Sequence, residues 1–350
     1  MLSELKIFSQ ALWLGLRGFG GPAAHLKLFS KELVGKDKWV DESEFRGLVS
    51  LASLLPGPTS SQVGIALGLE RGGLLGAAGF WLGFTLPSAL AMFVLTYLSF
   101  TSLNANTTLF WILKIAIALV IAHSVRQLAK RFVVGRVQFA ITLVSAAYYF
   151  FASNPYLQAV GLVVSALVGL TLIKSEAPLL HLKPAAISRN QALTFLALGL
   201  VVIAASPLFI HFHSWGLQTF GRFVQVGSLA FGGGHVILPL LQSRFVTTHL
   251  ISSATFARGY FFAQFMPGPL FSVAVFIGAS IATSTHSLSG AIQALCGIFL
   301  PGALLMLSGT YFWKGWSQNK KFVSAIAGVN ASVIGLLCVA CIDILRLART

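Results

Sequence analysis

Residues 55–62 read Leu-Pro-Gly-Pro-Thr-Ser-Ser-Gln, and residues 266–273 read Met-Pro-Gly-Pro-Leu-Phe-Ser-Val. Both stretches lie in or beside long apolar segments, at 45–69 and 256–284. Proline has no amide proton and clashes with the preceding turn, so a helix is interrupted at either motif. Two glycine runs, at 19–21 and 231–234, interrupt two further apolar segments. We therefore expect helices that are broken in their apolar interior.

The composition indicates the solvent around these helices. Of 350 residues, 56% are apolar and only 9% are charged, whereas soluble domains carry roughly 25% charged residues. So little charge cannot cover a surface in water, but the apolar runs approach the ~20 residues that cross a bilayer. The composition excludes a soluble enzyme, a disordered chain, a nucleic-acid-binding protein and a disulfide scaffold. It predicts an all-α, polytopic integral membrane protein in a lipid bilayer.

Eleven apolar stretches are candidates for membrane helices, and we expect about 10–12 helical segments. They fall at 5–20, 45–69, 73–100, 108–125, 137–152, 156–173, 192–210, 215–233, 256–284, 288–312 and 322–345. Irregular backbone at membrane depth is tolerated only where it is buried in protein or lines a wet cavity. The interrupted stretches are therefore the expected places for a binding site.

The two Pro-Gly-Pro motifs belong to an internal repeat. A shift of 212 positions aligns the two glycine runs, a shift of 211 aligns the two Pro-Gly-Pro motifs, and a shift of 214 aligns Leu-Pro-Ser-Ala-Leu at 86–90 with Leu-Pro-Gly-Ala-Leu at 300–304. Three matched motifs in the same order indicate a duplication. We predict a first repeat at 1–173, a cytoplasmic linker with a connecting helix at 174–211, and a second repeat at 212–350.

Loop charges orient these segments. Basic residues cluster at 126–136 and at 174–191, whereas the loop at 153–155 is uncharged. Positively charged loops stay in the cytoplasm, which also explains the net charge of +15. Segment 73–100 then runs outward, and the lysines at 314–321 make its counterpart 288–312 run inward. Inverted repeats with paired broken helices are typical of secondary transporters, which bind substrate where the repeats meet.

The helix expected after Pro58 is the first candidate for a binding element. Thr59 and Gln62 have capping-box spacing, which predicts a new helix there, and helix N-termini favour anions through free N–H groups and the helix dipole. The alternative is that each Pro-Gly-Pro motif is only a closely packed kink. The full set of substrate-binding candidates is Arg17, Gly20, Gly21, Pro56, Gly57, Pro58, Thr59, Ser60, Ser61, Gln62, Gly232, Gly233, Gly234, His235, Pro267, Gly268, Pro269 and Ser272.

Arg17 is a candidate because arginine is costly in an otherwise apolar segment. Its guanidinium fork suits a tetrahedral oxyanion, and its counterpart in the repeat is Leu229, so the repeated scaffold does not require the charge. The alternative is that the side chain snorkels to the membrane interface.

Acidic residues are almost absent from the apolar part of the chain. Between Arg71 and Ile342 the only one is Glu176, so a cation carrier would lack the carboxylates it needs, and the site is expected to favour anions. If protons are coupled to transport, the candidate carriers are His25 and Glu70. An ordinary core or interfacial histidine is the alternative for His25.

No pattern for catalysis or nucleotide binding is present, because the chain has no His-Glu-x-x-His, no Gly-x-Ser-x-Gly and no P-loop. We therefore predict no enzyme activity, no cofactor, no metal site and no nucleic-acid partner. A membrane-embedded enzyme or a scaffold is the alternative from another class. An enzyme would need a nucleophile or metal ligands within the membrane, and a scaffold would not need twinned helix breaks.

The sequence resembles the chromate ion transporter family, in its long, fused two-domain form. The resemblance rests on residues 19–25, 55–62, 231–234 and 266–269, and it spans both halves. It implies a multi-pass protein of the cell inner membrane that moves chromate, commonly outward, with sulfate as the related oxyanion. A carrier of sulfate or of another small anion is the alternative within transport. A homodimer is left open.

The second half departs from the first at two places. Gly234-His235 replaces Pro22-Ala23, and Val273 replaces Gln62. We therefore expect the two halves to contribute unequally to a site.

Overall fold

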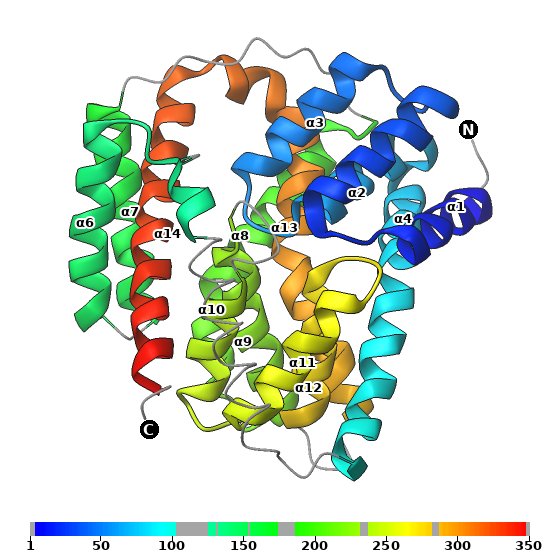
Figure 1. Ribbon diagram of the computed structural model, residues 1–350. Coiled ribbons are helices and arrows are strands. Elements are labelled where there is room, and N and C mark those ends of the chain that lie inside the picture. Colours follow the sequence, from blue (N-terminus) through cyan, green and yellow to red (C-terminus); the bar gives the residue numbers. More distant parts are fainter. Residues whose placement is uncertain are drawn as a thin grey trace.

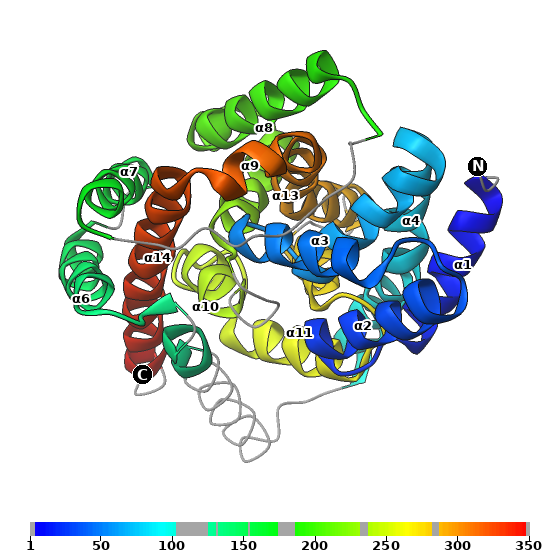
Figure 2. The ribbon, with the colours of Figure 1, turned by 90° about the horizontal axis from the view of Figure 1, so that it is seen from above.

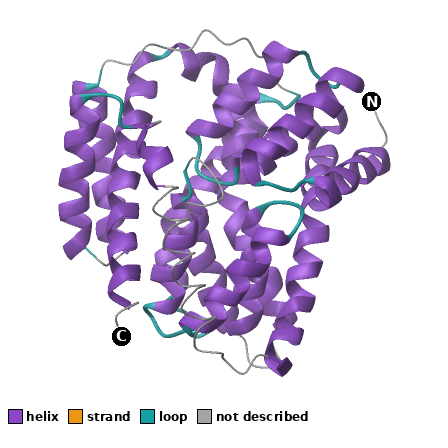
Figure 3. Ribbon diagram, viewed as in Figure 1, coloured by secondary structure: helices purple, strands orange, loops and turns teal. Residues whose placement is uncertain are grey.

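The computed structural model describes residues 4–102, 125–130, 132–152, 155–173, 186–231, 237–281 and 287–347. These residues are helical apart from short connections and one isolated bridge between Pro56 and Phe231 (Figure 3). The all-α fold class predicted from the composition is therefore confirmed.

The helices follow the predicted apolar segments closely. In the first part of the chain they are α1 (Glu4–Arg17), α2 (Gly21–Phe29), the π-helix η1 (Ser30–Lys36), α3 (Glu42–Leu54), α4 (Thr59–Ser102), α6 (Arg136–Phe151) and α7 (Pro155–Leu172). The others are α8 (Arg189–Phe209), α9 (Trp215–Leu229), α10 (Ile237–Leu241), the π-helix η3 (Gln242–Val246), α11 (Ser253–Phe265), the 3-10 helix η4 (Leu270–Ser272), α12 (Val273–Ile281), α13 (Ser287–Gln318) and α14 (Lys320–Leu347). The segment predicted at 108–125 lies outside the described residues except for its last residue.

Four helical stretches among the described residues are long and apolar enough to cross a membrane. They are residues 59–97 of α4, 189–209 of α8, 288–313 of α13 and 320–339 of α14. Together with the shorter apolar helices they make the chain a polytopic, multi-pass membrane protein.

The helix breaks lie where the proline and glycine motifs predict them. Helix α3 ends at Leu54 and α4 begins at Thr59, and α11 ends at Phe265 before η4 begins at Leu270. A further break divides α4 itself, because Gly73 has φ 60° and ψ −152°. The two arms of α4 fold back on each other there, so that a Cβ atom on Gly68 would lie 2.3 Å from the carbonyl oxygen of Gly76.

The capping box predicted for Thr59 and Gln62 is wrong. The helix begins at Thr59, so Pro58 occupies the cap position, and proline has no N–H group to donate the reciprocal bond. The Gln62 amide instead donates to the carbonyl oxygens of Pro56, at 2.8 Å, and Gly302, at 3.1 Å. A residue expected to close a helix end locally therefore joins two distant segments.

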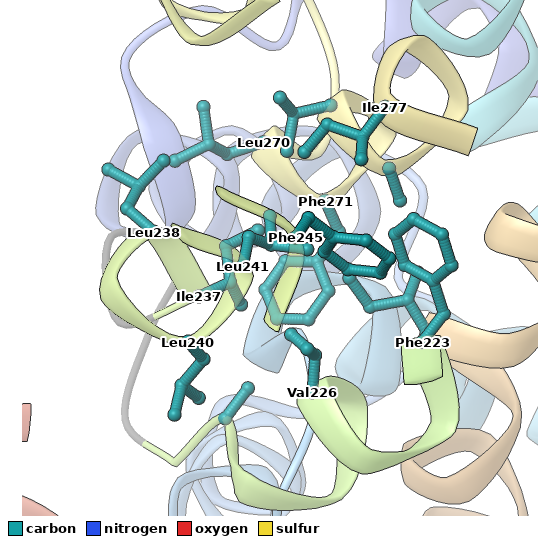
Figure 4. Close-up of a cluster of buried hydrophobic side chains, with 14 of the residues drawn as sticks. Phe223, Val226, Ile237, Leu238, Leu240, Leu241, Phe245, Leu270, Phe271 and Ile277 are labelled. Carbon is teal, nitrogen blue, oxygen red and sulfur yellow. The ribbon is translucent and has the colours of Figure 1, made fainter. Parts of the chain in front are cut away.

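The helices form a central body with a separate helix bundle at one side. In the bundle, α6 and α7 pack on α14, while in the central body α1 packs on α4 and α9 packs on α13 (Figures 1 and 2). In Figure 1, α2 and α3 lie in the upper part of the central body and α11 and α12 lie in the lower part. The buried cluster drawn in Figure 4 joins α9, α10 and η3 to η4 and α12.

Glycines set the helix spacing at positions that the repeat shift relates. A Cβ atom on Gly15 would lie 2.6 Å from the carbonyl oxygen of Phe84, where α1 meets α4. A Cβ atom on Gly227 would lie 2.2 Å from the carbonyl oxygen of Ile298, where α9 meets α13. Gly227 lies 212 positions after Gly15, and Ile298 lies 214 positions after Phe84. The same close helix contact therefore occurs twice.

The caps of two short helices repeat as well. The Asp41 side chain accepts a hydrogen bond from the N–H group of Glu44 at the start of α3. The Ser252 side chain accepts one from the N–H group of Thr255 at the start of α11. Each partner in α11 lies 211 positions after its counterpart in α3. The local structure before both Pro-Gly-Pro motifs is therefore alike.

The contact between α7 and α14 gives a prediction for stability. A Cβ atom on Gly328 would lie 2.1 Å from the carbonyl oxygen of Ser165, whereas one on Gly315 in α13 would meet nothing within 4 Å. We expect Gly328→Ala to destabilise the protein by about 1–3 kcal/mol, because backbone must move apart, and Gly315→Ala to change stability little. Thermal unfolding of both purified variants in detergent measures this. Equal melting temperatures would contradict the close packing of α7 on α14.

Candidate functional site

The first Pro-Gly-Pro motif contacts the end of α9 in the other half of the chain. The Gly57 N–H group donates to the carbonyl oxygen of Ala230 at 2.7 Å, and Pro56 forms a bridge with Phe231. Phe231 is the residue that opens the second glycine run. The break between α3 and α4 is therefore docked on the break that follows α9.

The second Pro-Gly-Pro motif makes the reciprocal contact. The Gly268 N–H group donates to the carbonyl oxygen of Gly18 at 2.7 Å, immediately before the first glycine run. Gly268 lies 211 positions after Gly57, and Ala230 lies 212 positions after Gly18. We call these two contacts the Gly57 crossing and the Gly268 crossing.

Both crossings require glycine. Gly57 has φ 125° and Gly268 has φ 107°, in a region that side chains with a Cβ atom rarely adopt. A Cβ atom on Gly57 would also lie 2.9 Å from Cα of Gly302, and one on Gly268 would lie 2.8 Å from Oγ of Ser88. Ser88 and Gly302 follow the matched prolines of α4 and α13, so each motif rests on the proline turn of a long helix.

His25 links the two crossings. Its Nε2 lies 2.8 Å from the carbonyl oxygen of Gly18, which also accepts the Gly268 N–H group, and its Nδ1 lies 3.1 Å from Oγ of Ser60. The carbonyl can only accept, so Nε2 carries a proton and donates. The Ser60 hydroxyl can donate to a neutral Nδ1 or accept from a protonated one, so both charge states of His25 keep their hydrogen bonds.

The Gly57 crossing keeps buried polar atoms without partners. Oγ of Ser61 and Oε1 of Gln62 have no hydrogen-bond partner among the described residues. Both side chains are at most 1% exposed. The first N–H groups of α4, which begins at Thr59, also have no acceptor inside the helix. Buried polar groups of this kind are costly unless something binds them, so this crossing can hold a polar ligand or water.

The helix start at the Gly268 crossing is mostly apolar, although the hydroxyls of Ser88 and Thr85 in α4 lie on the side of Gly268. Leu270, Phe271 and Val273 occupy the positions of Thr59, Ser60 and Gln62. Ser272 is its remaining hydroxyl at this helix start, and it is buried. The side chains at the two helix starts therefore differ, and an unequal contribution of the halves to a site stays a prediction.

The remaining predicted residues take no part in the two crossing hydrogen bonds, although Arg17 directly precedes Gly18. Arg17 is exposed at the end of α1, with its guanidinium carbon 4.3 Å from the centroid of the Trp13 ring. Glu70 is partly buried near the end of the first arm of α4. Gly20 and Gly21 have φ 93° and 77° and turn the chain into α2. Gly232, Gly233, Gly234 and His235 lie outside the described residues.

The sequence did not single out every residue of the crossings. Thr85, Ser88 and Gly302 were not among the predicted site residues, although the repeated Leu-Pro-x-Ala-Leu motif marked the positions of Ser88 and Gly302. Ala230 was missed because it contributes only its carbonyl oxygen, which no residue pattern reports. Within the described part of the chain, no cluster of three or more histidine, cysteine or acidic side chains could hold a metal ion.

Comparisons with known proteins identify relatives over nearly the whole chain. A family model described as "Chromate transporter" matches residues 5–211 and 217–350. The chain is 26% identical over 348 residues to a chromate transport protein of Pseudomonas aeruginosa, covering 98% of this chain and 81% of that protein. It is 28% identical over 342 residues to a chromate transport protein of Cupriavidus metallidurans, covering 93% of this chain and 79% of that protein.

An archaeal relative carries a less specific name. The chain is 26% identical over 343 residues to an uncharacterized transporter of Methanocaldococcus jannaschii, covering 96% of this chain and 83% of that protein. No solved structure matches the chain.

Substitution of the crossing glycines tests whether the crossings matter for activity. We expect Gly57→Ala and Gly268→Ala each to reduce transport of chromate at least about tenfold. The added Cβ atom would strain the backbone and clash at the contact between the halves, at a cost of roughly 1–3 kcal/mol. Gly35→Ala is the control, since its added Cβ would lie 3.6 Å from the nearest atom. The measurement is the initial transport rate of each variant, divided by the amount of protein inserted in the membrane. Normal rates in both crossing variants would reduce the motifs to packing kinks.

Proposed function

Because this chain belongs to the chromate transporter family, we propose that it is a secondary active transporter that exports chromate across the cell inner membrane. The observation that carries the proposal is the pair of crossings, where two sets of broken helices bury polar groups between the halves of the chain. Transporters bind their substrates at such discontinuous helices. The relatives' names and the family support a transporter and not an enzyme.

We propose that the two halves are inverted repeats, with boundaries at 1–173, 174–211 and 212–350. The support comes from the paired contacts: Gly57 with Ala230 and Gly268 with Gly18 are the same interaction made in both directions. In Figure 1, α4 ends at the lower edge of the molecule, whereas α13 ends near the upper edge, before α14 descends. Inversion would let one half close on one membrane face while the other opens.

The proposed binding site is the Gly57 crossing. The N-terminus of α4 supplies N–H groups and the positive end of its dipole, and Ser61 supplies a buried hydroxyl without a partner. A tetrahedral oxyanion accepts hydrogen bonds from both. The Oε1 atom of Gln62 is a hydrogen-bond acceptor, so it cannot bond directly to an oxygen atom that carries no hydrogen. A bound water or a protonated oxyanion would provide the hydrogen that it accepts.

We propose that His25 carries the coupled proton. It lies one hydrogen bond from Ser60 on α4 and one from the carbonyl that holds the Gly268 crossing. Its protonation would add a positive charge beside the bound anion without breaking either hydrogen bond. Glu70 is the alternative carrier, but ten residues of helix separate it from Ser60, which is about 15 Å.

Sulfate is the alternative substrate, because it is also a tetrahedral dianion and would make the same contacts. Both crossings are formed within one chain, so the proposed transport does not depend on a homodimer, which stays open as the assembly.

Flux through proteoliposomes tests the function. We expect uptake of radiolabelled chromate into vesicles holding the purified chain, with a rate that changes when a pH gradient is imposed. Gln62→Val copies the second half and removes both hydrogen bonds from Gln62 to the carbonyl oxygens of Pro56 and Gly302. At about 0.5–1.5 kcal/mol for each bond, we expect about a tenfold lower rate. Arg17→Leu is the comparison, and a normal rate there would assign Arg17 to the membrane interface.

The result of this assay also separates the alternatives. Faster flux of sulfate than of chromate would make sulfate the substrate, and a rate independent of pH in wild type would remove the proton from the mechanism. No flux of either anion above empty vesicles would refute the proposed function.

Cysteine labelling tests the inverted topology. In a background without native cysteines, a membrane-impermeant maleimide should reach cysteines at Ser188 and Lys320 from the cytoplasmic side and a cysteine at His211 from the opposite side. All three positions are exposed, so accessibility reflects sidedness. Labelling of His211→Cys and Lys320→Cys from the same side would contradict the inversion.

A further inference from the structure

Two arginines in the second half lie outside the crossings and have no role so far. Arg222 is on α9 and Arg244 is in η3, and both are partly buried. The residues that follow them, Phe223 and Phe245, are in contact, with ring centroids 4.6 Å apart (Figure 4). The two elements therefore pack directly, and the guanidinium groups lie within electrostatic reach of each other.

No described acid neutralises this pair. The side-chain ion pairs among the described residues are Lys36 with Glu32 and Arg46 with Glu42, all in the first half. The described polar partner of Arg244 is a neutral one, the Oε1 atom of Gln158 on α7. Two partly buried cations brought together repel each other and cost free energy unless an anion lies between them.

A buried amide lies on the same face of α9. Gln225 follows Arg222 by three residues, so both side chains project from one face of the helix. It is only 4% exposed, and neither Nε2 nor Oε1 has a hydrogen-bond partner among the described residues. A buried amide with both atoms unpaired is unusual, because most such groups are hydrogen-bonded. It is a second, independent sign that a polar ligand belongs here.

The first half shows what the scaffold forms at the equivalent positions. A cavity of about 440 Å³ there is lined by Gln10, Trp13 and Glu32, which lie 212 positions before Arg222, Gln225 and Arg244. The π-helices η1 and η3 begin at the same shift. The bond from the Trp39 N–H group to Leu33 likewise recurs from Ile251 to Phe245. The backbone around the first cavity therefore recurs around Arg222, Gln225 and Arg244.

The two places differ in their acids. The first cavity contains Glu32 and Asp37 beside the cations Lys6, Lys36 and Arg71, and the two acids pair with Lys36 and Gln10. In the second half Arg244 replaces Glu32 and His249 replaces Asp37. The cations of the first cavity thus have acids among them, whereas a cation and a histidine stand in the place of both acids in the second half.

We propose that Arg222, Arg244 and Gln225 form a second binding station for the transported oxyanion, apart from the Gly57 crossing. The substrate class is a tetrahedral dianion, whose two charges match the two guanidinium groups and whose oxygens match their bidentate N–H geometry. The station rests on the proposed function. With inverted repeats, it opens to the membrane face opposite the cavity of the first half, so it captures or releases the anion on that face.

The test uses the full chain in nanodiscs and in vesicles, with chromate and sulfate as probes. Arg244→Met removes the charge and keeps much of the side-chain bulk, Arg244→Lys keeps the charge and loses the fork, and Arg136→Gln is the control. Arg136 is exposed at the start of α6, so its loss removes one positive charge far from any described site. The readouts are the half-saturating anion concentration for flux and the anion-dependent rise in melting temperature.

We expect Arg244→Met to raise the half-saturating concentration at least about tenfold, since a hydrogen bond to a charged group is worth roughly 1.5–3 kcal/mol. The effect should appear with anion on one membrane face only, with a smaller change from Arg244→Lys and none from Arg136→Gln. Without anion, Arg244→Met should melt at or above the temperature of wild type, because one repelling cation is gone. A purely structural arginine would give the opposite, a lower melting temperature and an unchanged half-saturating concentration, and would overturn the station.

The outcomes separate the station from the proposed function. If wild type transports and Arg244→Met leaves the half-saturating concentration unchanged, the station is refuted and the function stands. If wild type transports neither anion but either one stabilises the protein only when Arg244 is present, the station stands and the function is refuted. If neither anion is transported or stabilises wild type, both are refuted.

Discussion

The structure depends on backbone hydrogen bonds that helices cannot make for themselves. At each break, proline and glycine leave peptide groups without partners inside the helix, and such groups are costly away from water. The Gly57 N–H group finds its acceptor at Ala230, and the Gly268 N–H group finds its acceptor at Gly18. Because each half satisfies the other, neither set of breaks can form alone, and the helices that hold the breaks must meet at one level.

The reciprocal geometry also explains where chemistry can differ between the halves. The backbone part of each crossing is held by glycine and proline and is the same twice. The side chains beside it are free to diverge, and they do: Ser60, Ser61 and Gln62 adjoin the Gly57 crossing, whereas Phe271 and Val273 adjoin the other. His25 then connects the polar crossing to the apolar one through the Gly18 carbonyl. The backbone of the crossing thus occurs twice, whereas the proposed binding site occurs at only one of the two crossings.

Sequence patterns predicted the parts of this structure that local chemistry decides. Proline and glycine placed the breaks, hydropathy placed the helices, and the repeat shift related the motifs. The patterns failed where a partner is distant. Gln62 was expected to cap its own helix but donates to Gly302, 240 positions away. The Arg17 guanidinium lies over the Trp13 ring, and its part in substrate binding stays a prediction. Side-chain direction and long-range backbone partners have no signature in a single sequence.

The distribution of charge suits the crossings to binding an anion and then releasing it. The side chains named at the Gly57 crossing are neutral except for the titratable His25, so the anion that we propose to bind there would be held by dipoles and hydroxyls without a permanent opposite charge. A permanent guanidinium at this depth would bind a dianion strongly and slow its release, whereas a cation that appears only on protonation of His25 can be switched off. The fixed charges, Arg222 and Arg244, lie in the middle of α9 and of η3, outside the two crossings. Both are only partly buried, so water can compete for the ion. Strong binding at Arg222 and Arg244, combined with weak and switchable binding at the Gly57 crossing, would let an ion both enter and leave.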